Sequence, residues 1–217
     1  GEGSPLHALR YLLARRLTRE QRFAEARDYF PTELKKTFDR FVKGLEVARD
    51  PRKSERLRAR GWWTAAEIAR IKGMEIMGAE NSPDWKSLGD GSYSFEHWFV
   101  DFRKSDRKDK LSATSPDERK RIEGSDIGDG KRFHYRYLAA GYAWNAVELL
   151  PDNSEPAAYM LCRAGRWIMN KDPETADRYY KTLVRRFRHT QLGREADQLH
   201  WFPDPESVAV VMKDFAL

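Results

Sequence analysis

The sequence has a single cysteine and no long apolar run, and these two absences exclude several classes of protein. One cysteine, Cys162, rules out an intrachain disulfide and a cysteine-rich metal site. It lies among apolar and small residues in AAYMLCRAG, which predicts a buried, unreactive thiol. No segment approaches the roughly 18 consecutive apolar residues of a membrane-spanning helix, so we expect no membrane span.

Signatures of catalysis are also missing. The sequence has no P-loop, no G-x-G-x-x-G and no G-x-S-x-G. Its five histidines form no H-E-x-x-H pattern, and no two of them lie three or four residues apart. We therefore expect a protein that is not an enzyme, with no metal site and no cofactor.

What the chain does contain is enough apolar surface for a core and an uneven distribution of charge. Hydrophobic residues make up 40% of the 217 residues and aromatic residues 12%, which argues against disorder. Residues 1–60 hold 16 Lys and Arg against 9 Asp and Glu, a balance of +7 within a net charge of +6. A solvated, arginine-rich helix face is the favoured interpretation of this basic segment, and acidic protein, anionic lipid or nucleic acid are the partners that its charge would suit. Acidic residues interrupt every basic run and no base-reading motif appears, so nucleic acid is not expected as a partner.

Helix starts recur along the sequence. Five pairs place a capping side chain directly before a proline, which is tolerated at the first helical position: Ser4-Pro5, Asp50-Pro51, Ser115-Pro116, Asp172-Pro173 and Asp204-Pro205. Signals for strands are scarce. The chain is therefore predicted to be all-α.

Apolar residues repeat at intervals of three and four residues, as on one face of a helix. Near the start, Leu6, Leu9, Leu13 and Leu17 form such a stripe. The predicted helices are 5–18, 20–30, 32–49, 51–78, 116–123, 131–150, 155–170, 173–188, 191–201 and 205–214. Their short connections favour antiparallel neighbours.

Small residues occur at the spacing of a known helical repeat. Ala14 precedes Ala26 by twelve residues, and Phe30 follows four residues later. The segment LLARRLTREQRFAEARDYF therefore resembles one tetratricopeptide repeat, a pair of helices about 34 residues long. The C-terminal half resembles the same family in AAGYAWNAVELLPDN and in AYMLCRAGRWIMNKDPETADRYYKTL. Several segments are also similar to uncharacterised bacterial helical-repeat proteins and to repeats of bacterial envelope scaffolding proteins.

The resemblance implies a tetratricopeptide-like superhelix, or solenoid, of antiparallel helical hairpins. We expect a single domain over residues 1–217, with hairpins at 1–78 and 131–217 and a long irregular insertion at 79–130. The start GEGSPLHAL opens directly into a helical pattern, so we expect a fragment of a larger bacterial protein, with the cell envelope as a candidate location.

The predicted function is a non-catalytic interaction or scaffold module that binds a protein or peptide. Its candidate contacts are three arginines on the predicted helices and three aromatic anchors in the insertion, namely Arg15, Arg19, Arg166, Trp85, Trp98 and Phe99. The end of helix 173–188 is also basic, but Arg185 and Arg186 suit the helix dipole there and need no partner.

One alternative stays open from the sequence. Carboxylates occur among aromatic residues in the insertion, at Glu80, Asp84 and Glu96. An apolar pocket keeps one acid of a glycosidase pair protonated, so this composition also suits a glycan-binding or glycan-processing domain.

Overall fold

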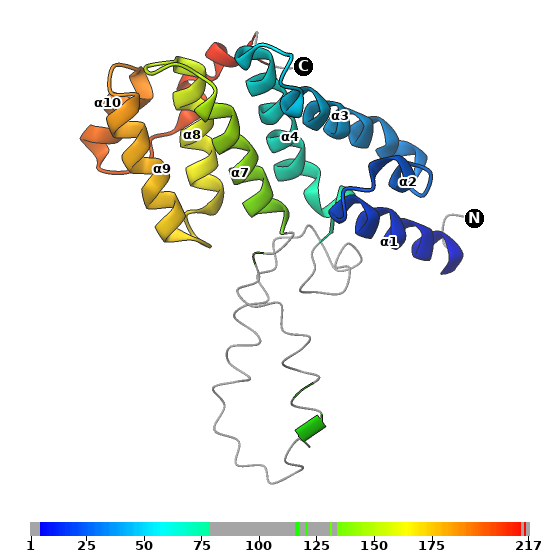
Figure 1. Ribbon diagram of the computed structural model, residues 1–217. Helices are drawn as coiled ribbons and strands as arrows, with labels where there is room; N and C mark the ends of the chain where they lie inside the picture. The colour runs from blue at the N-terminus through cyan, green and yellow to red at the C-terminus, as the bar shows by residue number, and fades with distance from the viewer. Residues whose placement is uncertain are drawn as a thin grey trace.

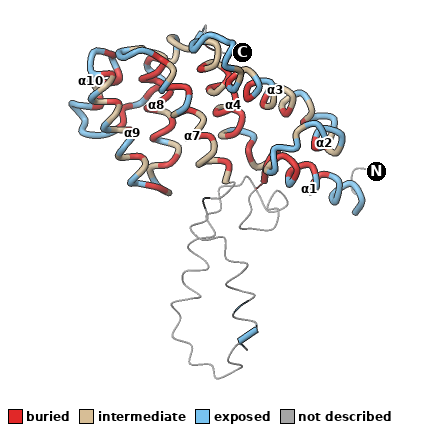
Figure 2. Tube along the Cα trace, viewed as in Figure 1, coloured by how far each residue is buried: buried red, intermediate tan, exposed pale blue. Residues whose placement is uncertain are grey.

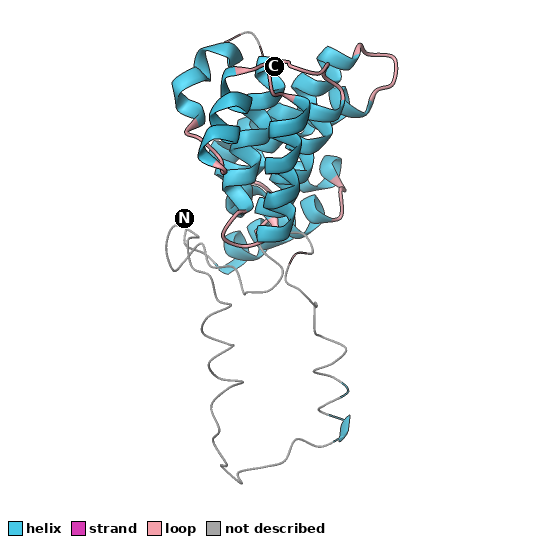
Figure 3. Ribbon diagram, turned by 90° about the vertical axis from the view of Figure 1, so that its left-hand side faces the viewer, coloured by secondary structure: helices cyan, strands magenta, loops and turns pink. Residues whose placement is uncertain are grey.

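The computed structural model describes residues 5–78, 116–117, 120, 131, 134–213 and 215, and these residues form helices joined by short connections (Figures 1 and 3). The helices are α1 (Pro5–Arg19), α2 (Phe23–Arg27), α3 (Thr32–Arg49), α4 (Glu55–Ile76), α7 (Tyr135–Glu148), α8 (Glu155–Ile168), α9 (Pro173–Arg186), α10 (Gln191–Leu199) and the 3₁₀ helix η2 (Pro205–Met212). The described part contains no strand. The prediction of an all-α chain is confirmed.

Each helix from α3 to α10 packs against the next one along the chain. Helices two apart also meet, through aromatic side chains. The rings of Phe41 and Tyr142 lie 6.3 Å apart and join α3 to α7, and the rings of Trp144 and Tyr179 lie 4.9 Å apart and join α7 to α9. Helices α3, α7 and α9 therefore form one layer.

The second layer contains α4, α8 and α10. Stacked rings of Trp63 and Trp167, 5.7 Å apart, join α4 to α8, and α8 contacts α10 directly. Between the layers lie fully buried alanines of α7 and α8, including Ala143 and Ala157. Small side chains at these positions let the two layers approach closely, which explains the alanine-rich composition of these helices.

Helices α3 and α4 cross closely at two glycines. A Cβ atom on Gly61 would lie 2.6 Å from the carbonyl oxygen of Gly44 and 2.7 Å from the amide nitrogen of Ala48. Backbone therefore packs on backbone at this point. Only glycine leaves room for it.

Helix α4 ends and α7 begins at the same end of the bundle (Figure 1). Gly73 of α4 packs against the ring of Tyr135, and an added Cβ on Gly73 would lie 2.3 Å from the Cβ of Tyr135. Gly78 then takes the left-handed conformation, with a φ of 66°, that commonly follows a helix. The predicted insertion between these helices, and most of the predicted helix 116–123, lie outside the described residues.

The predicted caps are confirmed at two positions. Asp172 accepts a hydrogen bond from the Thr175 amide at the start of α9, and Asp204 accepts one from Glu206 at the start of η2. The prediction at Asp50-Pro51 was wrong. Asp50 instead ends α3 and pairs with Arg52 in a turn, while Ser54 caps α4. The helix predicted over 205–214 is a 3₁₀ helix over Pro205–Met212, and Val208 within it has non-helical backbone angles.

The N-terminal hairpin differs most from the prediction. The expected helix 20–30 is limited to the five residues of α2. Figure 2 shows that exposed residues make up much of α1. Three leucines of the predicted stripe are exposed, and the buried residues instead include Tyr11 and Ala14. Only Leu17 of the predicted stripe is buried.

The C-terminal segment folds back over α8 and reaches the start of α4. Phe202 fills the space above Gly165, and the guanidinium of Arg56 lies 5.6 Å from the ring of buried Phe215. Under this segment, Cys162 is fully buried, and burial raises the pKa of its thiol to about 12. The prediction that this thiol is buried is confirmed.

Candidate interaction surface

The three arginines predicted to contact a partner make contacts inside the protein. Arg15 is only 4% exposed, with its guanidinium 4.0 Å from the ring centre of Tyr11, so the prediction that it reaches a partner is corrected. Arg19 donates a hydrogen bond to the carbonyl of Met77 and ties α1 to the end of α4. Arg166 is exposed but also donates to the carbonyl of Pro203, at 3.1 Å. The three side chains therefore do not form one site.

The other predicted residues lie outside the described part of the chain. These are the aromatic anchors Trp85, Trp98 and Phe99 and the carboxylates Glu80, Asp84 and Glu96. They stay predictions.

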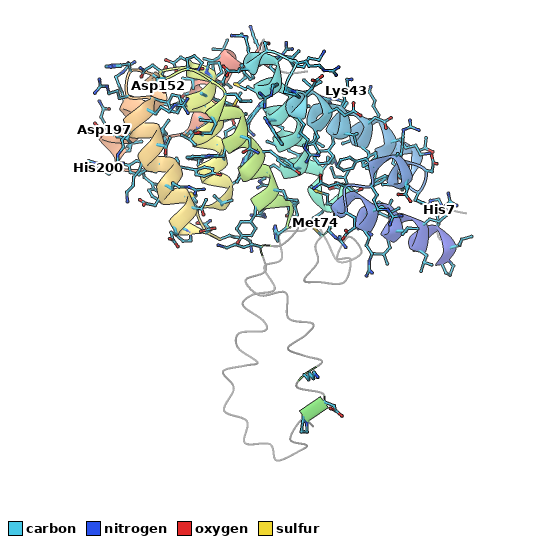
Figure 4. The ribbon with its side chains drawn as sticks, in the orientation of Figure 1. His7, Lys43, Met74, Asp152, Asp197 and His200 are labelled. Carbon is cyan, nitrogen blue, oxygen red and sulfur yellow. The ribbon has the colours of Figure 1, made fainter. Side chains whose placement is uncertain are left out.

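The described histidines are scattered. His7 lies on α1 and His200 follows α10 at the opposite end of the molecule (Figure 4). Among the described residues, no three His, Cys, Asp or Glu side chains come together in a way that would hold a metal ion. His134 has a structural role, because its Nδ1 accepts the amide of Arg136 at the start of α7. Burial, with Lys171 and Arg136 nearby, lowers its pKa to about 4.

The basic end of α9 has an internal partner that the sequence did not suggest. The guanidinium of Arg186 donates to the carbonyl of Val147, in the last turn of α7, and to that of Leu150, just after the helix. It also pairs with Glu148 at 3.4 Å and with Asp152 at 2.6 Å. The expectation that this arginine needs no partner is corrected: it caps the neighbouring helix.

The same use of arginine recurs elsewhere. Arg58 of α4 donates to the carbonyl of Ala48 near the end of α3, at 3.1 Å, and Arg194 of α10 donates to the carbonyl of His189, at 2.6 Å. Helix ends carry carbonyls without an intrahelical partner, and a guanidinium supplies several donors to them. Several arginines of the described residues therefore bind backbone carbonyls at or beside helix ends.

An exposed apolar stripe remains on α1. Leu6, Leu9 and Leu13 are 69%, 66% and 40% exposed. Together with Leu12 and two arginines, Arg10 and Arg16, they line a shallow groove of about 330 Å³. We call this set of six residues the leucine groove. Large apolar side chains that are clustered and exposed mark interaction sites more often than isolated ones do.

The opposite side of α1 holds the leucine groove in a defined orientation. The Tyr11 hydroxyl donates to the carbonyl of Glu75 at 2.8 Å, and its ring packs edge-on against Phe30. Arg10, at the edge of the leucine groove, donates to the carbonyl of Asp28 at 3.2 Å, and its guanidinium lies 5.2 Å from the ring centre of Tyr29. Helix α1 is thus fixed to α2 and α4 from Tyr11 onward, whereas residues 5–10 are all exposed.

A second groove lies between α2 and α3, with a volume of about 790 Å³ and with Phe23 and Val42 among its lining residues. Its charges are largely paired within the groove. Arg22 pairs with Glu25 at 2.6 Å, and Arg27 pairs with Asp39 at 2.7 Å. Because its cations already have acidic partners, this groove offers a ligand less unpaired charge than the leucine groove does.

A cluster of polar side chains surrounds Arg163 on the layer that contains α4 and α8. Its guanidinium donates to the Tyr159 hydroxyl at 2.7 Å, lies 5.9 Å from the ring centre of Trp167 and approaches Glu206 at 3.5 Å. Burial raises the pKa of the nearby Glu67 carboxyl, and the positive charge of Arg163 opposes that shift. These contacts hold η2 and the aromatic rings against α8, which is a stabilising arrangement.

No protein-family model, no curated protein and no solved structure matches this chain. The described helices also include none with the length and apolar character needed to cross a bilayer. A function can therefore be inferred only from the surfaces that the helices present.

Proposed function

We propose that this chain is a non-catalytic interaction module, a tetratricopeptide-like solenoid that binds a protein or peptide. The observation that carries the proposal is the leucine groove of α1. The large apolar side chains of α8 and α9 are buried or half-buried, whereas three leucines of α1 are exposed together. A helical array that satisfies its own backbone and leaves one apolar face exposed is suited to helix recognition.

The repeat-like packing supports the solenoid part of the proposal. The alanines that carried the resemblance are all 0% exposed and lie at helix contacts: Ala14, Ala26, Ala139, Ala143, Ala146 and Ala176. Two layers of helices built from consecutive hairpins are typical of such repeats. In this arrangement the surface is formed before the partner binds, so little conformational entropy is lost on binding.

The experiment compares three forms of the chain immobilised as bait for extracts of the source cell. They are the wild type, the double variant L9S/L13S and a matched control, L199S, which changes a leucine of α10 that is 62% exposed. Proteins that bind the wild type and the control, and are lost from the double variant, are the expected result. A retained set that is the same for all three would contradict the proposal, provided that circular dichroism shows equal helix content.

A further inference from the structure

The leucine groove has a narrow shape that matches one kind of occupant. Leu6, Leu9 and Leu13 follow the spacing of three and four residues that forms the seam of a coiled coil. Leu6 and Leu13 are seven residues apart, about 10 Å along the helix axis, which is two turns of a partner helix. An apolar stripe of this width suits the ridge of a second helix, because its side chains fit between those of α1.

The positive charge of α1 further restricts which kind of helix can bind to the groove. Residues 5–19 contain four arginines, Arg10, Arg15, Arg16 and Arg19, and no acidic residue. Two of the four, Arg10 and Arg16, line the leucine groove, about 9 Å apart along the axis. The side chain of Arg16 is exposed and makes no hydrogen bond or ion pair within the described residues that would neutralise it. The groove is therefore apolar along its floor and cationic at its edges.

This charge argues against a second copy of the chain as the occupant. Two α1 helices that met through their leucines would bring Arg10 and Arg16 of both copies into one small contact. Like charges across an interface oppose association. A helix with the same apolar spacing but with Glu or Asp beside it would instead meet Arg10 and Arg16 with opposite charge.

We propose that the leucine groove of α1 binds an acidic amphipathic helix of a partner protein. The partner helix presents apolar residues at i, i+3 or i+4 and i+7, and its flanking carboxylates pair with Arg10 and Arg16. This inference rests on the proposed function and names the chemistry of the partner. An anionic membrane surface would also suit this helix face, because it attracts arginines and the leucines can insert between its acyl chains. From Tyr11 onward the back of α1 is occluded, with Tyr11 and Ala14 buried, so this half of the helix leaves a stripe narrower than the apolar face of helices that lie in a bilayer.

The test uses the full chain and three synthetic helical peptides of equal length. The first carries a leucine stripe flanked by Glu, the second has the same stripe flanked by Lys, and the third is a scrambled form of the first. Binding is measured by fluorescence anisotropy at low and moderate salt. The acidic peptide is expected to bind, and its affinity is expected to fall with salt because the flanking pairs are exposed.

Two variants and two controls locate the contact. L9S is expected to weaken binding of the acidic peptide about tenfold, as truncation of a central contact does. R16E is also expected to weaken it, because the new carboxylate repels the carboxylates of the peptide. L199S and K36E change an exposed leucine and an exposed lysine outside the groove, and they are expected to leave the affinity unchanged. R16E is also expected to gain affinity for the peptide flanked by Lys.

The remaining outcomes separate the two proposals. Equal binding of the acidic and basic peptides, with the same loss in L9S, would overturn the acidic partner and leave the interaction module standing. Binding to vesicles that contain phosphatidylserine, lost in L9S, with no binding of any peptide, would replace the helix with a membrane. If neither peptides nor vesicles bind, and extract proteins are retained equally by L9S/L13S, both proposals fail.

Discussion

Arg186 provides the sharpest test of how the helices are held together. Its side chain is 23% exposed and reaches from the end of α9 to the carbonyls that end α7. The substitution R186A removes these donors and leaves the carbonyls of Val147 and Leu150 to water. The neighbouring variant R185A is a matched control, because the side chain of Arg185 is exposed and makes no hydrogen bond or ion pair within the described residues.

The expected loss follows from the contacts. Two hydrogen bonds to backbone carbonyls contribute about 1 kcal/mol each. The ion pairs to Glu148 and Asp152 add about 0.5 kcal/mol together, since these carboxylates are 54% and 71% exposed and the solvent screens them. The free energy of unfolding should therefore fall by about 2–3 kcal/mol in R186A. For a chain of this size that corresponds to a decrease in Tm of roughly 5–10 °C.

The assay is urea denaturation followed by far-UV circular dichroism, together with thermal melts. R185A should unfold within about 0.5 kcal/mol of the wild type, as surface substitutions do. R186K should fall between R186A and the wild type, because lysine keeps the charge but lacks the planar set of donors. If R186A and R185A unfold at the same urea concentration, Arg186 does not stabilise the end of α7, and its role as a cap between the two helices is refuted.

Two further predictions concern glycine and histidine. G61A should destabilise the fold by about 2–3 kcal/mol, because its methyl would overlap the Gly44 carbonyl. G141A, with nothing within 4 Å of the new Cβ, should stabilise the fold by about 0.5–1 kcal/mol. Equal melting temperatures of the two variants would refute the close crossing of α3 and α4. His134 is neutral when folded, with a pKa of about 4, so unfolding takes up a proton below its ordinary pKa of 6.5. Stability should fall by up to about 3 kcal/mol as the pH drops from 6.5 to 4, and H134N, which keeps an acceptor for the cap, should lose less; identical pH profiles would contradict this.

The helices themselves were largely predictable. Apolar spacing placed α3, α8 and α9 within two residues of their observed ends, since those helices carry one clear apolar face, and α8 and α9 also have a capped start. The cap at Asp50-Pro51 failed because an Asp-Pro pair also begins a turn, and the local sequence does not distinguish the two.

The apolar periodicity of the sequence does not predict which face of α1 is buried. The helix has two candidate faces, one with Leu6, Leu9 and Leu13 and one with Tyr11 and Ala14, and only the contacts with α2 and α4 decide which is buried. The more hydrophobic face, with the three leucines, is the exposed one. A signal was present in the composition, because a helix with four arginines and no acid is unusual in a chain with nearly balanced charge elsewhere.

The arginine contacts were not predictable either. The sequence shows that α9 has a basic end, but residue spacing does not predict that Arg186 caps α7. The burial of Arg15 is not predictable from spacing either, because a buried cation is rare. Both depend on backbone carbonyls or rings that only the packed helices bring within reach. The exposure of such groups is a property of the folded structure alone.

The junction of α4 and α7 has a consequence for how this architecture changes over evolutionary time. Gly73 and Tyr135 meet directly, and Trp62 stacks on Tyr142 further along the same pair of helices. These contacts do not require a connection of any particular length, since the two helix ends are already neighbours. A change in the length of the connection, by insertion or deletion, is therefore expected to leave α4 and α7 in contact.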